Sequence, residues 1–481
     1  MTNVDRRTLI AMLGAAGLLC LAACSPTSTM VGRTRGLPPN IVLIVTDDLG
    51  VGEVGCYGQT KIRTPNIDAL AARGVRFTDA YSGSPVCAPS RCTLLTGRHT
   101  GHAAIRDNRE LQPEGQMPLP STEVTLAVSL RARGYATAAI GKWGLGPPGS
   151  VGDPSRHGFD FFFGYMCQRH AHNHCPPYLY RNSERLPLPG NQAKYPAGTD
   201  MGAIYAPDLF LEESLRFVRE HEDGPFFLLF ATPVPHLALQ VPEDSLREYR
   251  GAFEERAYDG SRGYIPHPEP RAAYAAMVTR MDRDVGQLVE ALRSLPGDRD
   301  TLIIFTSDNG PTIDVGGADS GFFNSTGGLR GRKMELYEGG IRVPLIAAWT
   351  RREVVGVSRT TAAAWDLYPT IARLTGAQPT QELDGVDLSD ALLGRPMSPR
   401  EGPLYWEYPA GKGSQAVRIG PWKGVRRDVR GRPDAPFELY NLELDPAETT
   451  DVAASHPEIV ERMRAVAASR TPASIPAWNY D

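Results

Sequence analysis

The stretch Ile41-Val42-Leu43-Ile44-Val45-Thr46-Asp47-Asp48 joins five consecutive apolar residues to two carboxylates. A continuous run rich in β-branched residues is typical of a strand that is buried on both faces of a parallel sheet. Thr301-Leu302-Ile303-Ile304-Phe305 repeats this design and ends in Thr306-Ser307-Asp308-Asn309-Gly310. Ligands of open α/β sheets bind beyond the carboxyl ends of the strands, so the two acidic ends are predicted to meet at one site.

Strand and helix patterns alternate along the rest of the chain. Further strands are predicted at 75–77, 135–140 and 225–230, and helices at 66–73, 124–133 and 271–295. Met277 and Met281 lie on the apolar stripe of the last helix, so we interpret them as core residues. The pattern predicts an α/β protein with a large mixed, mostly parallel sheet flanked by helices.

The C-terminal part has a different pattern. Short strands are predicted at 404–408, 415–419, 422–426 and 437–440, and a helix begins at Pro457. We therefore expect a small domain of antiparallel sheet plus helix. The predicted organisation is a signal peptide at 1–23, a tether at 24–39, a main domain at 40–395 and a C-terminal α+β domain at 396–481.

The composition is that of an ordinary globular protein. The chain has 481 residues, of which 41% are hydrophobic and 22% are charged. Its formal net charge of −4 provides no general attraction to nucleic acid or to acidic lipid. Nucleic acid is therefore not an expected partner, and any recognition of anions must come from a few focused cations.

The N-terminus resembles an export signal. Arg6 and Arg7 precede an apolar run over 9–21 that is too short to span a bilayer as a mature helix. Leu21-Ala22-Ala23-Cys24 resembles a bacterial lipobox, which predicts a lipid anchor at Cys24 and a location in the periplasm or at the cell surface. The two arginines also loosely resemble a twin-arginine signal. The alternative is an ordinary secretory signal that is cleaved nearby.

A second informative stretch is Cys87-Ala88-Pro89-Ser90-Arg91-Cys92-Thr93-Leu94-Leu95-Thr96-Gly97-Arg98. Pro89 suits the first turn of a helix, so Cys87 is expected just ahead of a helix N-terminus, where free N–H groups and the helix dipole attract anions. Arg91 returns to the same side four residues later with a forked cation. The alternative is a buried Cys87, or one that forms a disulfide with Cys92.

The same stretch resembles the Cys-x-Pro-Ser-Arg signature of type I sulfatases, in the alkaline phosphatase superfamily, with its Leu-Thr-Gly-Arg continuation. The resemblance runs from Asn40 to about Ala468 and implies an alkaline-phosphatase-like fold and hydrolysis of a sulfate ester. It also implies that a formylglycine-generating enzyme oxidises Cys87 to formylglycine, whose hydrated form supplies the nucleophilic oxygen. An exported location favours a sulfated saccharide as the substrate.

The two acidic strand ends resemble the metal ligands of that family. Carboxylates that are packed together repel each other unless a cation lies among them. By resemblance, Asp47, Asp48, Asp308 and Asn309 would bind Ca²⁺, or alternatively Mg²⁺, and formylglycine at position 87 would supply a further oxygen. The alternative for an Asp-Asp pair after a strand is simple capping of a helix.

Gly141-Lys142-Trp143-Gly144-Leu145-Gly146 departs from the family pattern Gly-Lys-Trp-His-Leu-Gly. The resemblance implies that Lys142 contacts the sulfate, whereas the histidine that contacts the formylglycine hydroxyl is missing at Gly144. We expect a histidine from another loop to fill the space there and to act as the base that releases sulfate, with a pKa near 6.5. His172 is the candidate and His170 the reserve. A solvated loop or a zinc site is the alternative for this histidine-rich segment.

Two further residues take roles from the resemblance. His236, in Pro235-His236, resembles the family histidine that binds sulfate and assists the leaving group. Lys333, five residues before Glu338-Gly339-Gly340, resembles the lysine that contacts the ester oxygen, and Arg91 would orient the nucleophile. Arg330 and Arg342 are interpreted as structural.

Some interpretations remain open at this point. Cys56, Cys92, Cys167 and Cys175 remain for an oxidising compartment, and Cys167–Cys175 is the preferred disulfide. A formylglycine-dependent phosphonate or phosphodiester hydrolase is the near alternative in function. A non-catalytic lipoprotein that binds sulfated glycans is disfavoured, because the nucleophile and metal-ligand positions are retained.

Overall fold

The computed structural model describes residues 37–112, 114–191 and 202–480. Residues Leu37–Asp481 form one compact unit. The predicted signal peptide, the lipid anchor at Cys24 and most of the tether lie outside the described residues, and the boundary at 395/396 stays a prediction. Within the described ranges, no helix is long and apolar enough to cross a membrane.

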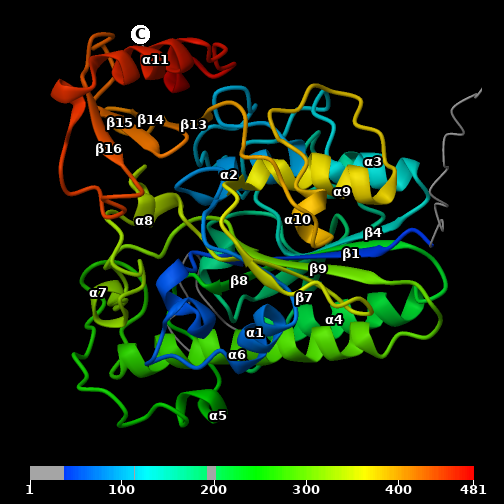
Figure 1. Ribbon diagram of the computed structural model, residues 1–481. Coiled ribbons are helices and arrows are strands. Elements are labelled where there is room, and N and C mark those ends of the chain that lie inside the picture. Colours follow the sequence, from blue (N-terminus) through cyan, green and yellow to red (C-terminus); the bar gives the residue numbers. More distant parts are fainter. Residues whose placement is uncertain (1–36, 113, 192–201, 481) are drawn as a thin grey trace, which may run out of the picture. The chain divides into compact units, whose positions relative to one another are not determined.

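A ten-stranded sheet forms the centre of this unit (Figure 1). Its strands, in spatial order, are β11 (Gly356–Ser358), β2 (Val75–Phe77), β10 (Leu345–Trp349), β9 (Thr301–Ser307), β1 (Asn40–Asp47), β8 (Phe226–Pro235), β4 (Ala136–Lys142), β5 (Phe161–Tyr165), β6 (Tyr178–Arg181) and β7 (Glu184–Pro187). The five strands from β9 to β5 are mutually parallel, whereas β10, β6 and β7 add antiparallel pairs. The predicted mixed, mostly parallel sheet is confirmed.

The register of the central strands aligns their carboxyl ends. Thr46 of β1 lies opposite Ser307 of β9, and Asp47 lies opposite Pro235 of β8. The acidic residues that follow β1 and β9 therefore emerge at the same edge of the sheet, as the two repeated sequence patterns predicted.

Every residue of β1 is buried, because helices cover both faces of the sheet. Val42 and Ile44 pack into one core with α1 (Pro65–Ala72), α4 (Ala206–Glu220) and α6 (Pro270–Arg293), which lie below the sheet in Figure 1. Ile41, Leu43 and Val45 pack into a second core with α2 (Cys87–Thr96), α3 (Leu126–Ala132), α9 (Leu367–Thr375) and α10 (Ser389–Leu392). The short helices α5 (Glu243–Leu246), α7 (Ser320–Phe323) and α8 (Glu338–Ile341) lie in connecting loops.

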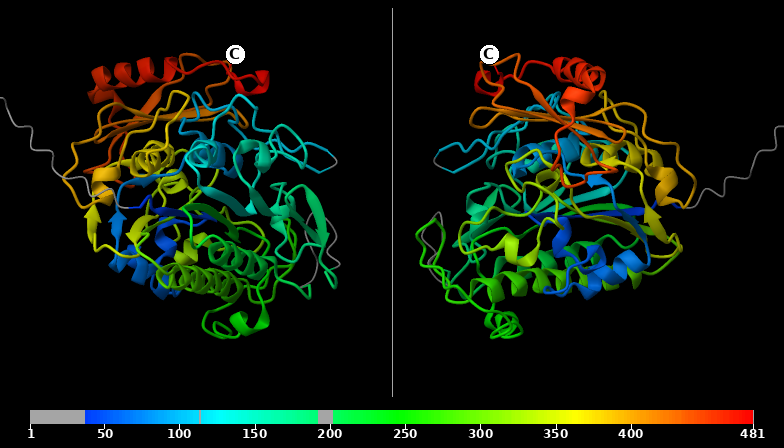
Figure 2. Two further views of the ribbon diagram at one scale, coloured as in Figure 1. Left: turned by 90° about the vertical axis from the view of Figure 1, so that its right-hand side faces the viewer. Right: turned by 60° about the vertical axis from the view of Figure 1, so that its left-hand side comes forward.

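The C-terminal part forms a separate antiparallel sheet with the order β13 (Leu404–Tyr408), β14 (Ser414–Ile419), β15 (Trp422–Arg427) and β16 (Phe437–Asn441). Helix α11 (Pro457–Ala468) packs on one face through Met463 and Ala467. Trp406 on the other face reaches the main part, where its Nε1 donates to the carbonyl of Ser82 at 2.9 Å. Figure 2 shows this sheet, in orange, between α11, in red, and the main part. The predicted small α+β region is confirmed.

The cysteines differ from the sequence-based expectation. The preferred Cys167–Cys175 disulfide is wrong, since both residues are buried thiols. The Cys167 Sγ lies 3.2 Å from the carbonyl oxygen of Gly115, whereas Cys175 lies beside Gly202. The 3₁₀ turn η4 (His170–His172) separates the two cysteines, so each packs against a different neighbour.

Candidate active site

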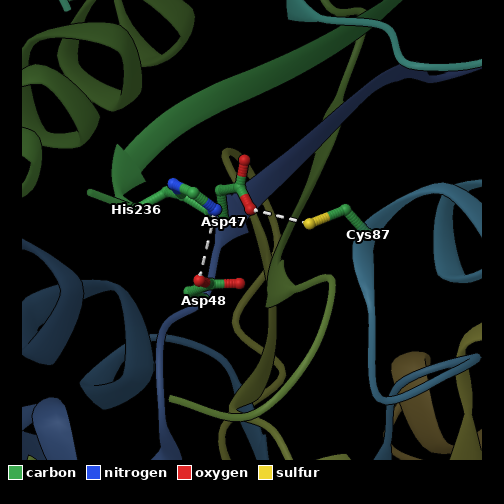
Figure 3. A group of neighbouring side chains, drawn as sticks. All are labelled: Asp47, Asp48, Cys87 and His236. Carbon is green, nitrogen blue, oxygen red and sulfur yellow. Dashed lines mark hydrogen bonds and ion pairs between the residues drawn. The ribbon is translucent and has the colours of Figure 1, made fainter. Parts of the chain in front are cut away.

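Four strand ends bring polar side chains together at the carboxyl edge of the sheet. Asp47 ends β1, Lys142 ends β4, and His236 follows β8 directly. Asp308 and Asn309 follow β9. Figure 3 shows the Asp47 carboxylate facing the Cys87 thiol and the His236 ring facing Asp48. All of these side chains are buried.

The two acidic strand ends are locked to each other by hydrogen bonds. Asp48 has a φ of +66°, an uncommon value for a residue other than glycine, and this turn directs its carboxylate back towards β9. The Asp48 backbone N–H donates to Asp308 Oδ1 at 3.2 Å, and Asn309 Nδ2 donates to Asp48 Oδ1 at 2.7 Å. The predicted convergence of Asp47, Asp48, Asp308 and Asn309 is therefore confirmed as a geometry.

Cys87 is the first residue of α2, one step further into the helix than the sequence predicted. Its Sγ lies 3.4 Å from Asp47 Oδ1 and 3.6 Å from Lys333 Nζ. The neighbouring N–H of Ala88 donates to Asn108 Oδ1 at 2.9 Å. No sequence pattern pointed to Asn108, because its contact with α2 is made through the tertiary fold.

Three cations face the three carboxylates. Arg91 donates to Asp308 Oδ2 from Nε at 3.0 Å and from Nη2 at 2.8 Å, and its Nη1 donates to the Lys142 carbonyl at 2.7 Å. The Lys142 ammonium is paired with Asp47, and the Lys333 ammonium lies 2.7 Å from both oxygens of Asp48. These ion pairs place three cationic groups at the carboxyl edge of the sheet, each held by a carboxylate.

Burial and these ion pairs perturb the ionisation of the site. Burial opposes ionisation of Asp47, but Lys142, Arg91 and the other basic groups together hold its pKa well below the usual range. Burial, followed by repulsion from Asp47, raises the pKa of Asp308 to about 6. Burial, again with Asp47, raises the pKa of the Cys87 thiol to about 12, so this thiol stays protonated near neutral pH.

His172 lies in the site, but not where the sequence placed it. Its ring packs on His236 with the centroids 4.3 Å apart, and its Nδ1 lies 3.4 Å from the Tyr264 hydroxyl. The expected pKa near 6.5 is wrong, because burial, the neighbouring His236 and two lysines lower the pKa of His172 well below that value. His172 is therefore neutral in this site.

The space beside Gly144 is filled by another residue. A Cβ atom on Gly144 would lie 2.3 Å from Nε2 of Gln168, so the Gln168 amide occupies the volume assigned to a histidine. The expectation that a histidine fills the space beside Gly144 is therefore wrong. The catalytic role of His172 itself stays a prediction, since its ring still adjoins His236.

The three histidines of the 170–174 segment point to different neighbours. The His170 ring packs on Tyr178 with the centroids 4.4 Å apart, and His174 Nε2 donates to the His236 carbonyl at 2.7 Å. In the part of the chain that the structure describes, they form no group that could hold a metal ion. The zinc alternative and the reserve role of His170 therefore receive no support from this geometry.

A potential metal-binding group does lie in the site. The ligand atoms of Asp47, Asp48, Cys87 and His236 all lie within 4.8 Å of one another. Asp308 is absent from this group because Arg91 and the Asp48 N–H hold its carboxylate. Asn309 Oδ1 is buried and makes no hydrogen bond with any described residue, which leaves it available as a ligand.

Glu53, in the 3₁₀ turn η1 (Val51–Glu53), gives a prediction about stability. It is fully buried, and burial raises its pKa from 4.5 to about 7. The unfolded chain releases this proton at lower pH than the folded protein, so the stability contributed by neutral Glu53 is present below pH 4.5 and is lost as the pH rises through 7. The shift corresponds to about 3 kcal/mol.

We therefore expect Glu53→Gln to raise the thermal unfolding midpoint at pH 8 and to leave it nearly unchanged at pH 4.5. Glutamine can still accept from the Gly50 N–H and donate to the Tyr274 hydroxyl, which Glu53 contacts at 2.7 and 2.6 Å. Thermal unfolding of both proteins across this pH range is the measurement. An equal shift at both pH values would contradict the protonated state of Glu53.

Comparison with known proteins identifies the family. The family model named Sulfatase matches residues 39–377. The chain is 34% identical to human arylsulfatase A over 92% of this chain and 90% of that protein, and 28% identical to the N-acetylgalactosamine-6-O-sulfatase of Bacteroides thetaiotaomicron over 96% and 98%. The crystal structure of Ps i-CgsB superposes with a TM-score of 0.76 at 29% identity over 92% and 95% of the two chains. With the acidic strand ends, the Cys87 helix and the facing lysines in one site, this chain belongs to the sulfatase family of sulfuric ester hydrolases.

Proposed function

We propose that this enzyme removes sulfate from a sulfated saccharide, using formylglycine at position 87 and a bound divalent cation. The observation that carries the proposal is Cys87 at the N-terminus of α2, beside three buried carboxylates, the buried cations Arg91 and Lys142, and the partly buried Lys333. When present, formylglycine supplies a nucleophilic oxygen, and the cation supplies positive charge for the sulfate oxygens.

The residues of the site suit a hard cation. Asp47, Asp48, Asp308 and the orphaned Asn309 Oδ1 provide oxygen ligands, which Ca²⁺ and Mg²⁺ prefer. Ca²⁺ is the first choice and Mg²⁺ the second. The direct test is the metal content of the purified protein, measured together with the recovery of activity when each ion is returned after chelation.

The state of Cys87 supports modification over thiol chemistry. Reactive cysteines need a lowered pKa, whereas the pKa of Cys87 is raised to about 12. We expect the formylglycine-generating enzyme to convert this residue. Peptide mass spectrometry of protein that was co-expressed with that enzyme tests the conversion, and active protein that carries only the thiol would refute it.

The other residues hold the substrate and move protons. Lys142 and Lys333 would bind the sulfate oxygens, and Arg91 keeps Asp308 and the end of β4 in place. His236 Nδ1 donates to the Leu237 carbonyl at 2.7 Å, so Nε2 faces the site, and a proton bound to Nε2 would pass to the oxygen of the departing alcohol. Neutral His172 is able to accept a proton when sulfate is released.

The names of two relatives support a saccharide substrate. One is an N-acetylgalactosamine-6-O-sulfatase, and Ps i-CgsB has been solved in complex with k-i-k-neocarrahexaose. Turnover of a panel of defined sulfated saccharides and 4-nitrophenyl sulfate would identify the substrate class. Phosphate and phosphonate esters belong in the same panel, and preferred turnover of those esters would replace sulfatase activity as the proposal.

We also propose export to the periplasm or cell surface with a lipid anchor at Cys24. The lipobox-like sequence before Cys24 supports this location. Fractionation of cells that produce the full chain, with Cys24→Ala as the comparison, tests the anchor. We expect the full chain to remain in the membrane fraction and Cys24→Ala to be released from it.

The proposed base gives a kinetic prediction. We expect His172→Ala to release about one alcohol per active site rapidly and then to turn over about 10² to 10³ times more slowly, because only sulfate release needs this base. Rapid-mixing kinetics with an aryl sulfate measures both phases. His170→Ala is the matched control, since its ring packs on Tyr178, and it should show ordinary turnover. Unchanged turnover in His172→Ala would exclude this residue as the base.

A further inference from the structure

Gln168 is a buried amide whose hydrogen-bonding atoms have no partner among the residues that the structure describes. Only 6% of the residue is exposed. Neither Nε2 nor Oε1 forms a hydrogen bond with any residue in 37–112, 114–191 or 202–480. Buried side-chain amides in native proteins normally have partners, because leaving them unpaired costs free energy. An amide in this state is available to a ligand.

The position of Gln168 follows from two loops that run side by side. Beyond β4 and β5, the Trp143 N–H donates to the Tyr165 carbonyl at 2.9 Å and the Gly144 N–H donates to the Met166 carbonyl at 3.2 Å. Gly144 has a φ of +73° and no side chain, and the Gln168 amide fills the space that a side chain there would need. The absence of a side chain at Gly144 therefore makes room for the Gln168 amide, and we treat the two residues as one structural unit.

This unit follows Lys142, a residue of the site, closely in the chain. Gly144 is two residues from Lys142, a span of at most about 7 Å along the chain. The Lys142 ammonium pairs with Asp47, and the Lys142 carbonyl accepts a hydrogen bond from Arg91. The Gln168 amide therefore packs against a residue only two positions beyond Lys142, whose ammonium and carbonyl both belong to the site.

We propose that Gln168 is a further catalytic residue, whose side-chain amide donates a hydrogen bond to a sulfate oxygen of the substrate. The inference rests on the proposed sulfatase function. An amide neither gains nor loses a proton near neutral pH, so Gln168 contributes binding and orientation and does not replace the base. Its effect is therefore distinct from that of His172.

Gln168→Ala tests the inference with inorganic sulfate as the binding probe. We expect the inhibition constant of sulfate to rise about tenfold and kcat/KM for an aryl sulfate to fall about 10- to 100-fold, the range of one hydrogen bond to a charged group. The thermal unfolding midpoint should fall only slightly, because the lost amide has no hydrogen-bond partner among the described residues. Gln168→Glu should weaken sulfate inhibition further, because its carboxylate has the same shape but repels an anion.

Gln415→Ala is the matched control. Gln415 is also a buried amide, but it donates to Tyr405 Oη at 2.8 Å and accepts from Arg426 Nη1 at 3.1 Å in the C-terminal sheet. Its loss should lower the unfolding midpoint and leave sulfate inhibition unchanged.

Two results would overturn the role of Gln168. One is an inhibition constant and a kcat/KM within twofold of the wild-type values in Gln168→Ala. The other is a lowered unfolding midpoint with unchanged sulfate inhibition, which would make the amide structural. Failure of the wild-type enzyme to hydrolyse any sulfate ester would instead refute the proposed function.

Discussion

Replacement of Cys87 with alanine is expected to abolish turnover, by a factor of about 10⁴ or more. The proposed nucleophilic oxygen is formed from this side chain, and the neighbouring lysines and carboxylates are unable to supply another. The fold should survive, because the change removes a single sulfur atom, whose polar contacts among the described residues are with Asp47 and Lys333. Steady-state turnover and thermal unfolding of the variant measure the two effects.

Cys92→Ala is the matched control for this prediction. Cys92 lies on the same helix and is fully buried in the second core, away from the strand ends. Its replacement should lower the unfolding midpoint and retain turnover. Loss of activity in Cys92→Ala with normal activity in Cys87→Ala would contradict the assignment of the nucleophile.

Asp308→Ala is expected to remove bound metal and activity together, with turnover at least about 10³-fold lower. A hard cation loses an oxygen ligand, while Asp47 and Asp48 remain close to each other. The substitution also removes both hydrogen bonds of the buried Arg91 to Asp308 and leaves it only the Asp47 carboxylate, 3.6 Å away, at a cost of up to roughly 3–5 kcal/mol in stability. Elemental analysis, turnover in the presence of added Ca²⁺ and thermal unfolding measure these effects.

Asp319→Ala separates the loss of an arginine partner from the loss of the site. Asp319 accepts two hydrogen bonds from Arg271, at 3.0 and 2.6 Å, in the same forked arrangement that joins Asp308 to Arg91. This control should lose some stability but keep its metal and turnover. Full activity without metal in Asp308→Ala would refute the metal site.

Several features were readable from local sequence because they depend on local physics. The apolar runs at 41–45 and 301–305 identified strands buried on both faces, and their acidic ends predicted one site. The Cys87 stretch predicted a helix N-terminus that the structure places within one residue. The resemblance in the same stretch indicated the family that the comparisons then established.

Other features depended on which loops meet in space. The sequence suggested a histidine for the gap at Gly144 and a Cys167–Cys175 disulfide, whereas the structure places Gln168 in that gap and keeps both cysteines as thiols. No periodic pattern encodes the packing of these irregular segments, so neither outcome was available from spacing alone.

The sheet, the acidic strand ends and the Cys87 helix follow from the sequence alone, because burial periodicity, strand polarity and helix-start signals act over a few residues. Tertiary packing, in contrast, brings Gln168 beside Gly144 and His172 onto His236. It also decided that Cys87 is a protonated thiol, because burial and distant charges set its pKa. Those properties arise where residues far apart in the chain exclude water from one another.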